Sequence, residues 1–312
     1  MTPSPSLSLV TCSFRGDFDA CVLLCESADR FVPDEIVHEL VVPRQDVELF
    51  APLASSRRRI TPTDAYLPPS FHLVPMPPPA WRRRLRLPRR NVYATPYSAP
   101  VRGWIAQQIL KISAVLNGPA DVVIHLDSDN AFIRDLDPTL ILRDGKARLY
   151  EAASPVDSDS HRQWHAAACR LLGIHPPTPA TADYIDQMVV WTKDQTRALT
   201  ERIERTTRHP WYVTLARTRQ FAEYELYGVH AREVVGIDQA GVFADSQSLC
   251  HARWEGNFAG PEDVDAFVSS LEPYHVVCLL QSTLDLDVAH RRHIFARVEA
   301  QARKQDASRS RP

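Results

Sequence analysis

The sequence predicts an α/β protein in which a mixed, mostly parallel sheet is flanked by helices, with a surface excursion rich in proline and arginine. Short apolar β-branched runs such as Val122–Leu126 alternate with segments of helical apolar spacing such as Phe18–Phe31. The 312 residues, 44% of them hydrophobic, suffice for a sizeable core. Residues 61–100 hold so many prolines that they fit neither a central sheet nor a long helix.

The first βα unit is expected at 7–31, with a strand at 7–12, a polar turn and a helix that Pro33 ends. The unit resembles the first βα unit of nucleotide-binding, Rossmann-like folds. Helix-start N–H groups, with Thr11, Ser13 and Arg15 nearby, are candidates to hold nucleotide oxygens. The alternative is an ordinary helix capped by Ser13 or Asp17.

The remaining elements alternate in the same way, and the apolar spacing and turn residues set their bounds. Strands are expected at 38–42, 57–60, 122–126, 130–142 in part, 148–152, 184–192, 234–243 in part and 276–280. Helices are expected at 102–116, 160–172, 193–208, 261–271 and 288–304, with a short helix after the strand within 38–50 and a disordered tail at 305–312. We therefore expect one domain over 1–290, with an excursion at 61–100, and a basic C-terminal segment over 291–312.

Two carboxylates follow the apolar run at 122–126. Asp127 and Asp129 stand one residue apart where this predicted strand ends. Buried unpaired carboxylates are costly, whereas Mg²⁺ or Mn²⁺ prefers oxygen ligands and shares them with substrate phosphates. Ligands of open α/β sheets bind at the carboxyl ends of strands. The pattern indicates a metal–diphosphate site; the alternative is a polar turn that ends the strand.

The totals exclude several classes of protein. The chain carries 36 Lys and Arg against 38 Asp and Glu, so its charge does not indicate nucleic-acid binding. Its six cysteines form no Cys-x-x-Cys pair, which favours a reducing, cytoplasmic location. No secretory signal is visible, and no run approaches the ~18 apolar residues of a membrane-spanning helix.

A basic run lies inside the excursion, between Arg82 and Arg90. Its positive field would attract phosphate, anionic sugars or acidic lipid heads, so it is the candidate for a peripheral membrane contact. The alternative is a solvated basic loop. The run consists of Arg82, Arg83, Arg84, Arg86, Arg89 and Arg90.

The segment Val123–Ile133, with its Asp-Ser-Asp, resembles the DxD segment of GT-A glycosyltransferases. Segments 10–18, 103–111, 221–228 and 250–254 are similar to an uncharacterised bacterial family of GT-A-like proteins. The resemblance implies a GT-A-like fold and a hexosyl-type glycosyltransferase with Mn²⁺ or Mg²⁺. It also implies a nucleotide-diphosphate sugar donor and an acceptor hydroxyl on a glycan, small molecule or natural product.

The resemblance also assigns roles to individual residues. The helix before the DxD strand carries Gln108 and Lys111, candidates to reach the donor sugar or a DxD carboxylate. A late histidine completes the metal shell in such enzymes, and His251 fits that place, since imidazole is acceptable to Mn²⁺. The alternatives are an exposed polar helix face and a surface histidine.

Two further pairs of residues are candidates for sugar binding and catalysis. Asp186 and Gln187 precede an apolar run and suit sugar hydroxyls. Glu223, or failing that Glu225, stands among aromatic residues, where desolvation raises a carboxyl pKa and suits a general base in an inverting transfer. Their neighbours Tyr224 and Tyr227 are candidates to stack on sugar rings. The alternatives are a capped strand turn and the acidic start of a helix. A retaining reaction would not require the acidic base.

Two other functions compete with glycosyl transfer. Haloacid-dehalogenase phosphatases also place Asp-x-Asp after a strand, but near the N-terminus and with Thr or Val where this chain has Ala131. A non-catalytic sugar- or nucleotide-binding module would need neither metal nor base, so its ligand binding would survive Asp129→Ala.

Overall fold

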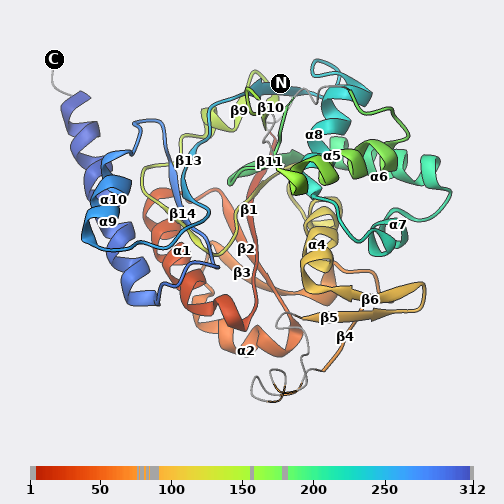
Figure 1. The fold of residues 1–312 in the computed structure, drawn as a ribbon, viewed down its shortest axis with the longest axis horizontal. Coiled ribbons are helices and arrows are strands. Elements are labelled where there is room, and N and C mark those ends of the chain that lie inside the picture. The colour runs from red at the N-terminus through yellow and green to blue at the C-terminus, as the bar shows by residue number, and fades with distance from the viewer. Residues whose placement is uncertain are drawn as a thin grey trace.

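The central sheet has five strands in the order β11-β7-β1-β2-β3 (Figure 1). The computed structural model describes residues 5–309 apart from 76, 78–80, 82–83, 85–90, 155–157 and 178–181. Neighbouring strands from β7 to β3 run parallel, and β11 is antiparallel to β7, which confirms the mixed, mostly parallel sheet. The strands are β1 (Leu7–Cys12), β2 (Val37–Val42), β3 (Arg58–Pro62), β7 (Val122–His125) and β11 (Val189–Thr192).

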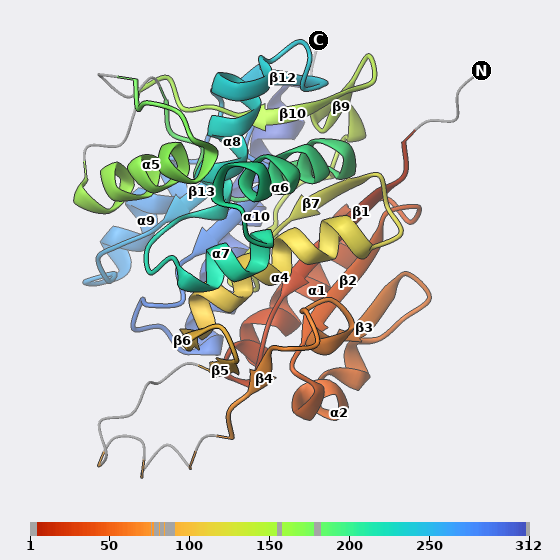
Figure 2. The same cartoon turned by 90° about the vertical axis from the view of Figure 1, so that its right-hand side faces the viewer.

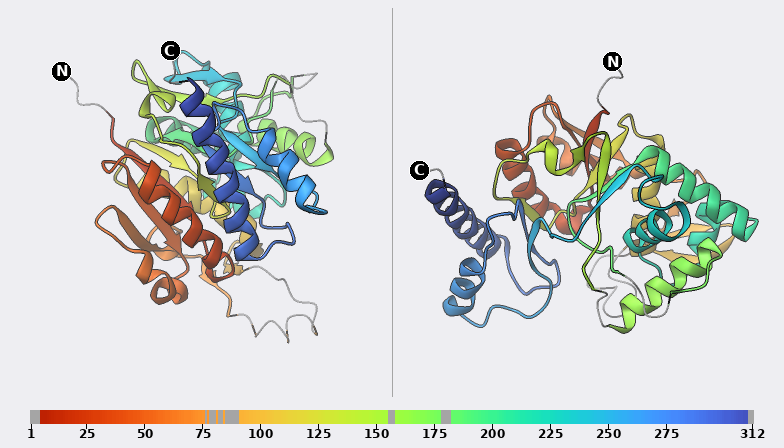
Figure 3. Two further views of the ribbon diagram at one scale, coloured as in Figure 1. Left: turned by 90° about the vertical axis from the view of Figure 1, so that its left-hand side faces the viewer. Right: turned by 90° about the horizontal axis from the view of Figure 1, so that it is seen from above.

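Helices cover both faces of this sheet. Figure 2 shows α4, α6 and α7 in front of one face, and the left view of Figure 3 shows α1 and α10 side by side over the other. The helices are α1 (Phe18–Phe31), α2 (Val47–Phe50), α4 (Gly103–Asn117), α5 (Asp159–Leu172), α6 (Lys193–Thr207), α7 (Trp211–Arg217), α8 (Glu223–Val229), α9 (Pro261–Ser269) and α10 (Val288–Arg309). The described residues include no helix with the length and apolar character needed to cross a membrane.

Three smaller sheets surround the central one. Their orders are β12-β10-β9, β13-β14-β8 and β4-β5-β6, and the last lies beside α4 (Figures 1 and 2). The strands are β4 (His72–Leu73), β5 (Val92–Thr95), β6 (Ser98–Arg102), β8 (Asn130–Phe132), β9 (Leu142–Arg143), β10 (Lys146–Tyr150), β12 (Val242–Asp245), β13 (Cys250–Arg253) and β14 (Val277–Leu280).

The core explains why β7 is so apolar. Val122, Val123 and Ile124 are buried in the main cluster, which joins the central sheet to α4 and α6. A second cluster, with Ile294, Phe295 and Val298 of α10, packs against α9 and the β8–β14 sheet. A strand with both faces covered needs apolar side chains on both sides, and its polar residues can begin only where it ends.

Two expected elements need correction, and the excursion carries a small sheet. The excursion at 61–100 carries the β4-β5-β6 sheet in its described part, formed from residues on either side of the proline- and arginine-rich stretch. The late strand expected within 234–243 begins only at Val242, after a π-helical turn at His230–Val235. Helix α10 continues past Lys304 to Arg309, so no disordered tail begins at residue 305.

The candidate lipid-contact run lies mostly outside the described residues. Arg84 is described and exposed. Arg82, Arg83, Arg86, Arg89 and Arg90 lie outside the described part of the chain.

Candidate functional site

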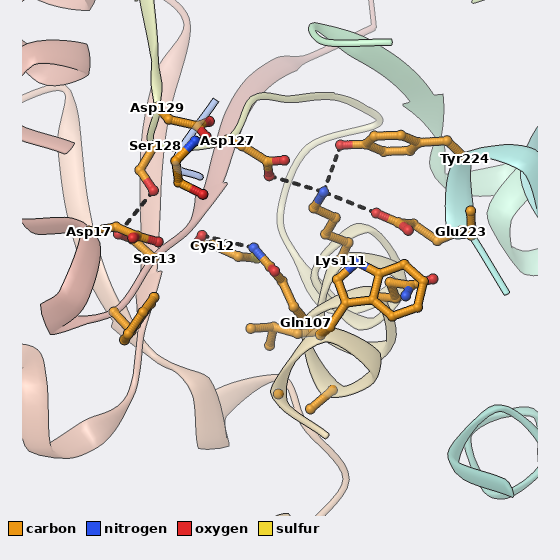
Figure 4. A pocket seen from close by; sticks show the side chains of 18 of the residues that line it. Cys12, Ser13, Asp17, Gln107, Lys111, Asp127, Ser128, Asp129, Glu223 and Tyr224 are labelled. Atoms are coloured by element: carbon orange, nitrogen blue, oxygen red, sulfur yellow. Dashed lines mark hydrogen bonds and ion pairs between the residues drawn. The ribbon is translucent and has the colours of Figure 1, made fainter. Parts of the chain in front are cut away.

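A polar cavity of about 290 Å³ opens at the carboxyl ends of the parallel strands β1 and β7. Asp127, Ser128 and Asp129 line it directly after β7, and Cys12 and Ser13 line it at the end of β1 (Figure 4). Helices α4 and α8 contribute further walls. The lining also includes Asp17, Trp104, Gln107, Gln108, Lys111, Trp164, Asp186, Gln187, Glu223, Tyr224, Trp254, Gln281 and Ser282.

The two carboxylates after β7 differ in environment. Asp127 has a side chain that is 32% exposed, whereas Asp129 is buried. One oxygen of Asp129, Oδ2, accepts the backbone N–H of Ser282 at 2.8 Å, and the other, Oδ1, is buried without a hydrogen-bond partner. Burial, together with the charge of Asp127, raises the pKa of Asp129 to about 7. The carboxylate is thus fixed on one side and unpartnered on the other.

Lys111 is the buried cation of the site. Its Nζ lies 3.1 Å from Asp127 Oδ1, lies 3.0 Å from Glu223 Oε1 and donates to the Tyr224 hydroxyl at 2.7 Å (Figure 4). Burial alone would lower the pKa of Lys111, but the charges of Asp127 and Glu223 raise it well above its usual value. An ion pair thus joins helix α4 to the turn after β7.

Gln108 lies one helical turn before Lys111 and also lines the cavity. It is 1% exposed, and neither its amide nitrogen nor its amide oxygen has a hydrogen-bond partner. The large majority of buried side-chain polar atoms in proteins have a hydrogen-bond partner, so this amide is unusual. It can donate to and accept from a ligand in the cavity.

Asp186 and Gln187 line the cavity next to Asp127. Asp186 accepts from the Ser248 hydroxyl through Oδ1, while its buried Oδ2 has no partner. Burial raises the pKa of Asp186 to about 6. Gln187 accepts from Asn130 Nδ2 at 3.0 Å and from the Asp127 backbone N–H at 3.4 Å, so it also braces the turn after β7.

Glu223 and Glu225 point to different places. Residues two apart on a helix lie on different faces. Glu223 lines the cavity, and its carboxylate is paired with Lys111, a partner that the sequence argument left out. Glu225 does not line it; its carboxylate lies 2.6 Å from His165 Nδ1 of α5 and accepts the Tyr184 backbone N–H. Burial raises the pKa of Glu225, and the bond to His165 opposes this rise.

The two tyrosines of α8 also lie in different surroundings. Tyr224 lines the cavity beside Lys111, whose Nζ lies 4.4 Å from the centre of its ring. Tyr227 is fully buried and stacks on Trp191 at 4.9 Å, so the expectation that it stacks on a sugar was wrong.

Of the three candidates from the first βα unit, one lines the cavity and two do not. Ser13 lines the cavity. The Thr11 hydroxyl is fully buried and hydrogen-bonded to the His38 ring, and Arg15 is paired with Asp46 at 2.6 Å. Neither of these two belongs to the cavity lining.

His251 lies on the other side of its strand. Successive side chains of a strand point to opposite faces. The Cys250 thiol faces Asn130, beside the turn after β7, so His251 faces away, stacks on Phe267 and lies within 2.8 Å of the Phe267 carbonyl oxygen. His251 is not part of the cavity lining, and the site geometry does not bring it to Asp127 and Asp129.

Several lining residues were not among the site candidates from the sequence, although two of them lie in segments 103–111 and 250–254. Trp104, Trp164 and Trp254 come from three distant segments, and Trp104 and Trp164 lie 5.9 Å apart between ring centres. Tryptophans are common in cores, so only the tertiary fold reveals that these three line a cavity. Ser282 contributes a backbone N–H, which any residue but proline would supply.

The residues fit a divalent cation that a substrate helps to bind. Among the residues that the structure describes, no group of three or more His, Cys, Asp or Glu is placed to hold a metal ion. Mg²⁺, however, is commonly held by one or two carboxylates together with substrate phosphates. Asp127 and the unpartnered Oδ1 of Asp129 supply two such carboxylates in one cavity.

The fold and cavity define an α/β protein with a cavity lined by charged and polar side chains at the carboxyl ends of parallel strands. Residues 6–300 match the model described as "Family of unknown function (DUF6492)", and the chain belongs to that family. No curated protein matches the chain.

Three of the similar solved structures share 10–14% sequence identity with the chain, with TM-scores of 0.40–0.44. Mouse xyloside xylosyltransferase 1, apo form, is 10% identical over 90% of this chain and 99% of its own, with a TM-score of 0.44. An active-site mutant of LgtC is 13% identical over 93% of this chain and 95% of its own, with a TM-score of 0.42. The galactosyltransferase LgtC in complex with donor and acceptor sugar analogs is 14% identical over 94% of this chain and 95% of its own, with a TM-score of 0.40.

Proposed function

We propose that this protein is a GT-A-type, metal-dependent glycosyltransferase that moves a sugar from a nucleotide-diphosphate sugar to an acceptor hydroxyl. The observation that carries the proposal is the composition of one cavity. Asp127, Asp129 and Lys111 meet there with the unpartnered polar atoms of Gln108 and Asp186. An oxygen-rich, anionic ligand with hydroxyl groups, bound together with a divalent cation between it and the carboxylates, would satisfy all of these groups together.

Each charged group has a role toward such a ligand. Asp127 and Asp129 would hold Mn²⁺ or Mg²⁺, which when bound supplies charge neutralisation for the departing nucleoside diphosphate. Lys111 Nζ holds the Asp127 carboxylate in place and adds a fixed positive charge beside it. The position of the DxD carboxylates at a strand end suits the phosphates of the donor.

The sugar would be oriented by uncharged polar groups and by carboxylates. Gln108 offers its amide NH2 group as a donor and its amide oxygen as an acceptor, and Asp186 Oδ2 offers an acceptor for a hydroxyl. Such groups are left unpaired by a substrate that lacks the matching hydroxyl, which gives strong discrimination between sugars.

Glu223 is the proposed general base of an inverting transfer. Its carboxylate lines the cavity and is held by Lys111 at 3.0 Å. In that role it would take the proton of the acceptor hydroxyl as the hydroxyl oxygen attacks the anomeric carbon and the bond to the diphosphate breaks. In a retaining transfer this role disappears, while the donor site remains as described.

The test is a thermal-shift panel of UDP-, GDP- and dTDP-sugars, each with and without Mn²⁺. We expect at least one nucleotide sugar to raise the melting temperature, and only in the presence of Mn²⁺. Asp129→Ala should abolish that shift. Retained binding in Asp129→Ala would indicate a non-catalytic binding module, and a panel without any shift would refute the proposed function.

A further inference from the structure

A buried arginine of the C-terminal helix donates hydrogen bonds to the backbone of the loop that follows β14. Arg291 lies near the start of α10 and is 6% exposed. Its guanidinium donates to the carbonyl oxygens of Gln281 at 3.0 Å, Leu284 at 3.5 Å and Leu286 at 3.3 Å, and also to that of Leu280. One side chain therefore serves four carbonyls of residues 280–286, here called the β14 loop.

The β14 loop in turn holds Asp129. The Leu280 backbone N–H donates to the Asp129 carbonyl oxygen at 3.1 Å, and the Ser282 N–H donates to Asp129 Oδ2 at 2.8 Å. Gln281 and Ser282 also line the cavity. Because Oδ2 is occupied by the loop, Oδ1 is the oxygen that remains for a ligand.

The chemistry of this contact requires arginine. The loop buries several carbonyl oxygens that point toward one place, and buried carbonyls without donors are costly. A guanidinium has five N–H donors in a planar fork, whereas a lysine ammonium has three on a flexible stem. The guanidinium of Arg291 donates to backbone carbonyl oxygens, whereas its neighbour Arg292 is exposed and paired with Glu26 of α1.

We propose that Arg291 is a positioning residue for the metal-binding carboxylate of Asp129, acting through the β14 loop. Arg291 orders the loop, the loop fixes Ser282 N–H on Oδ2, and that bond sets the direction of Oδ1. This role rests on the proposed function, in which Asp129 binds the cation. It gives α10 a part in the site, although the helix itself lies over the opposite face of the sheet from α4 (Figure 3).

The experiment compares four proteins: wild type, Arg291→Met, Arg291→Lys and Arg292→Met. Arg292→Met is the matched control, because it removes the adjacent guanidinium of the same helix without touching the β14 loop. Amide hydrogen exchange is measured over the β14 loop, and Mn²⁺ binding is followed by EPR with Mn²⁺ alone and with UDP, GDP or dTDP. Near-UV circular dichroism checks that each variant is folded.

We expect Arg291→Met to speed exchange of the Ser282 amide at least tenfold and to weaken Mn²⁺ binding by about tenfold, the usual effect of losing a group that orients a metal ligand. Arg291→Lys should fall between Arg291→Met and wild type in both measurements, and Arg292→Met should match wild type. If Arg291→Met does not fold, Arg291→Lys carries both measurements.

Unchanged exchange at Ser282 in the folded Arg291 variants would overturn the proposal, as would faster exchange with unchanged Mn²⁺ binding. If wild type binds no Mn²⁺ with any of the three nucleotides, the proposed function fails. The exchange of the Ser282 amide then decides by itself whether Arg291 positions Asp129.

Discussion

The Lys111 ion pairs allow a stability prediction that can be worked from the structure. In Lys111→Met the aliphatic volume remains, but Asp127 and Glu223 lose their cation. Glu223 has a side chain that is only 7% exposed, so its carboxylate is left buried without a charged partner. Breaking a buried pair from one side costs about 3–5 kcal/mol, and most of this cost comes from Glu223, because Asp127 is one-third exposed.

A control pair with the same geometry lies on the surface. Lys146 Nζ is 3.0 Å from Asp238 Oδ1, the same distance as between Lys111 and Glu223, but the two side chains are 43% and 93% exposed. Exposed pairs contribute about 0–1 kcal/mol. Lys146→Met should therefore change the free energy of unfolding by no more than about 1 kcal/mol, and the difference between the two variants measures burial rather than distance.

The assay is urea unfolding followed by far-UV circular dichroism at pH 7 without metal or nucleotide, for Lys111→Met, Glu223→Gln and the double variant. Because the amide of Glu223→Gln needs no cation, the double variant should cost about 1–3 kcal/mol less than the sum of the single variants. The raised pKa of Lys111 keeps its stabilisation fully present below the unfolded-state value of 10.5; it disappears only as the pH rises through the higher folded-state value. The cost of losing the Lys111 charge should thus be similar at pH 7 and pH 9.

Two results would refute this reasoning. One is a cost for Lys111→Met that lies within the range of Lys146→Met. The other is additivity of Lys111→Met and Glu223→Gln to within about 0.5 kcal/mol, which would mean that the two side chains do not interact.

Three further predictions concern the other cavity residues. Gln108→Leu removes a buried amide without partners, so it should raise the free energy of unfolding by about 1–2 kcal/mol in urea titrations. The same substitution should weaken nucleotide-sugar binding at least tenfold, as measured by calorimetry. An unchanged affinity would exclude Gln108 from the site. Glu223→Gln should lower kcat about 10²–10⁴-fold while the donor Kd is preserved, and Glu225→Gln, outside the cavity, should retain kcat; equal losses in both variants would contradict the assignment. Burial raises the pKa of Asp186 from 3.8 to about 6, so the free energy of unfolding decreases as the pH rises through this interval. In urea titrations, Asp186→Asn should therefore stabilise the free protein by up to about 3 kcal/mol at pH 7.5 but little at pH 4. A gain in stability that does not depend on pH would show that ionisation of Asp186 is not its source.

Part of the site could be predicted from the sequence because its signals are local. The apolar run at Val122–Ile124 required a buried strand, and Asp127 and Asp129 followed at its end. The helical spacing of α4 put Gln108 and Lys111 one turn apart, so a single face had to carry both. Patterns of this kind depend on a few consecutive residues and survive without knowledge of the tertiary fold.

The remainder depends on which side of an element faces the cavity. His251 follows Cys250 in β13, and one step along a strand reverses the side-chain direction. Glu225 follows Glu223 by two residues in α8, which turns it toward α5 and His165. The composition of either segment is the same whichever residue faces inward. Which residue faces the cavity is therefore determined only by the packing of β13 on β14 and of α8 on α5.

The predicted signs of the stability changes separate a ligand site from a merely structural cluster. In a structural cluster every group contributes to folding, and each substitution that disturbs the cluster lowers stability. Here Lys111→Met should destabilise the free protein, because it leaves charges buried. Gln108→Leu and Asp186→Asn should stabilise it, because they remove buried groups that the protein alone leaves incompletely paired. If all three weaken nucleotide-sugar binding despite opposite effects on folding, their shared property is contact with the ligand. Natural proteins keep costly unpartnered groups where function requires them.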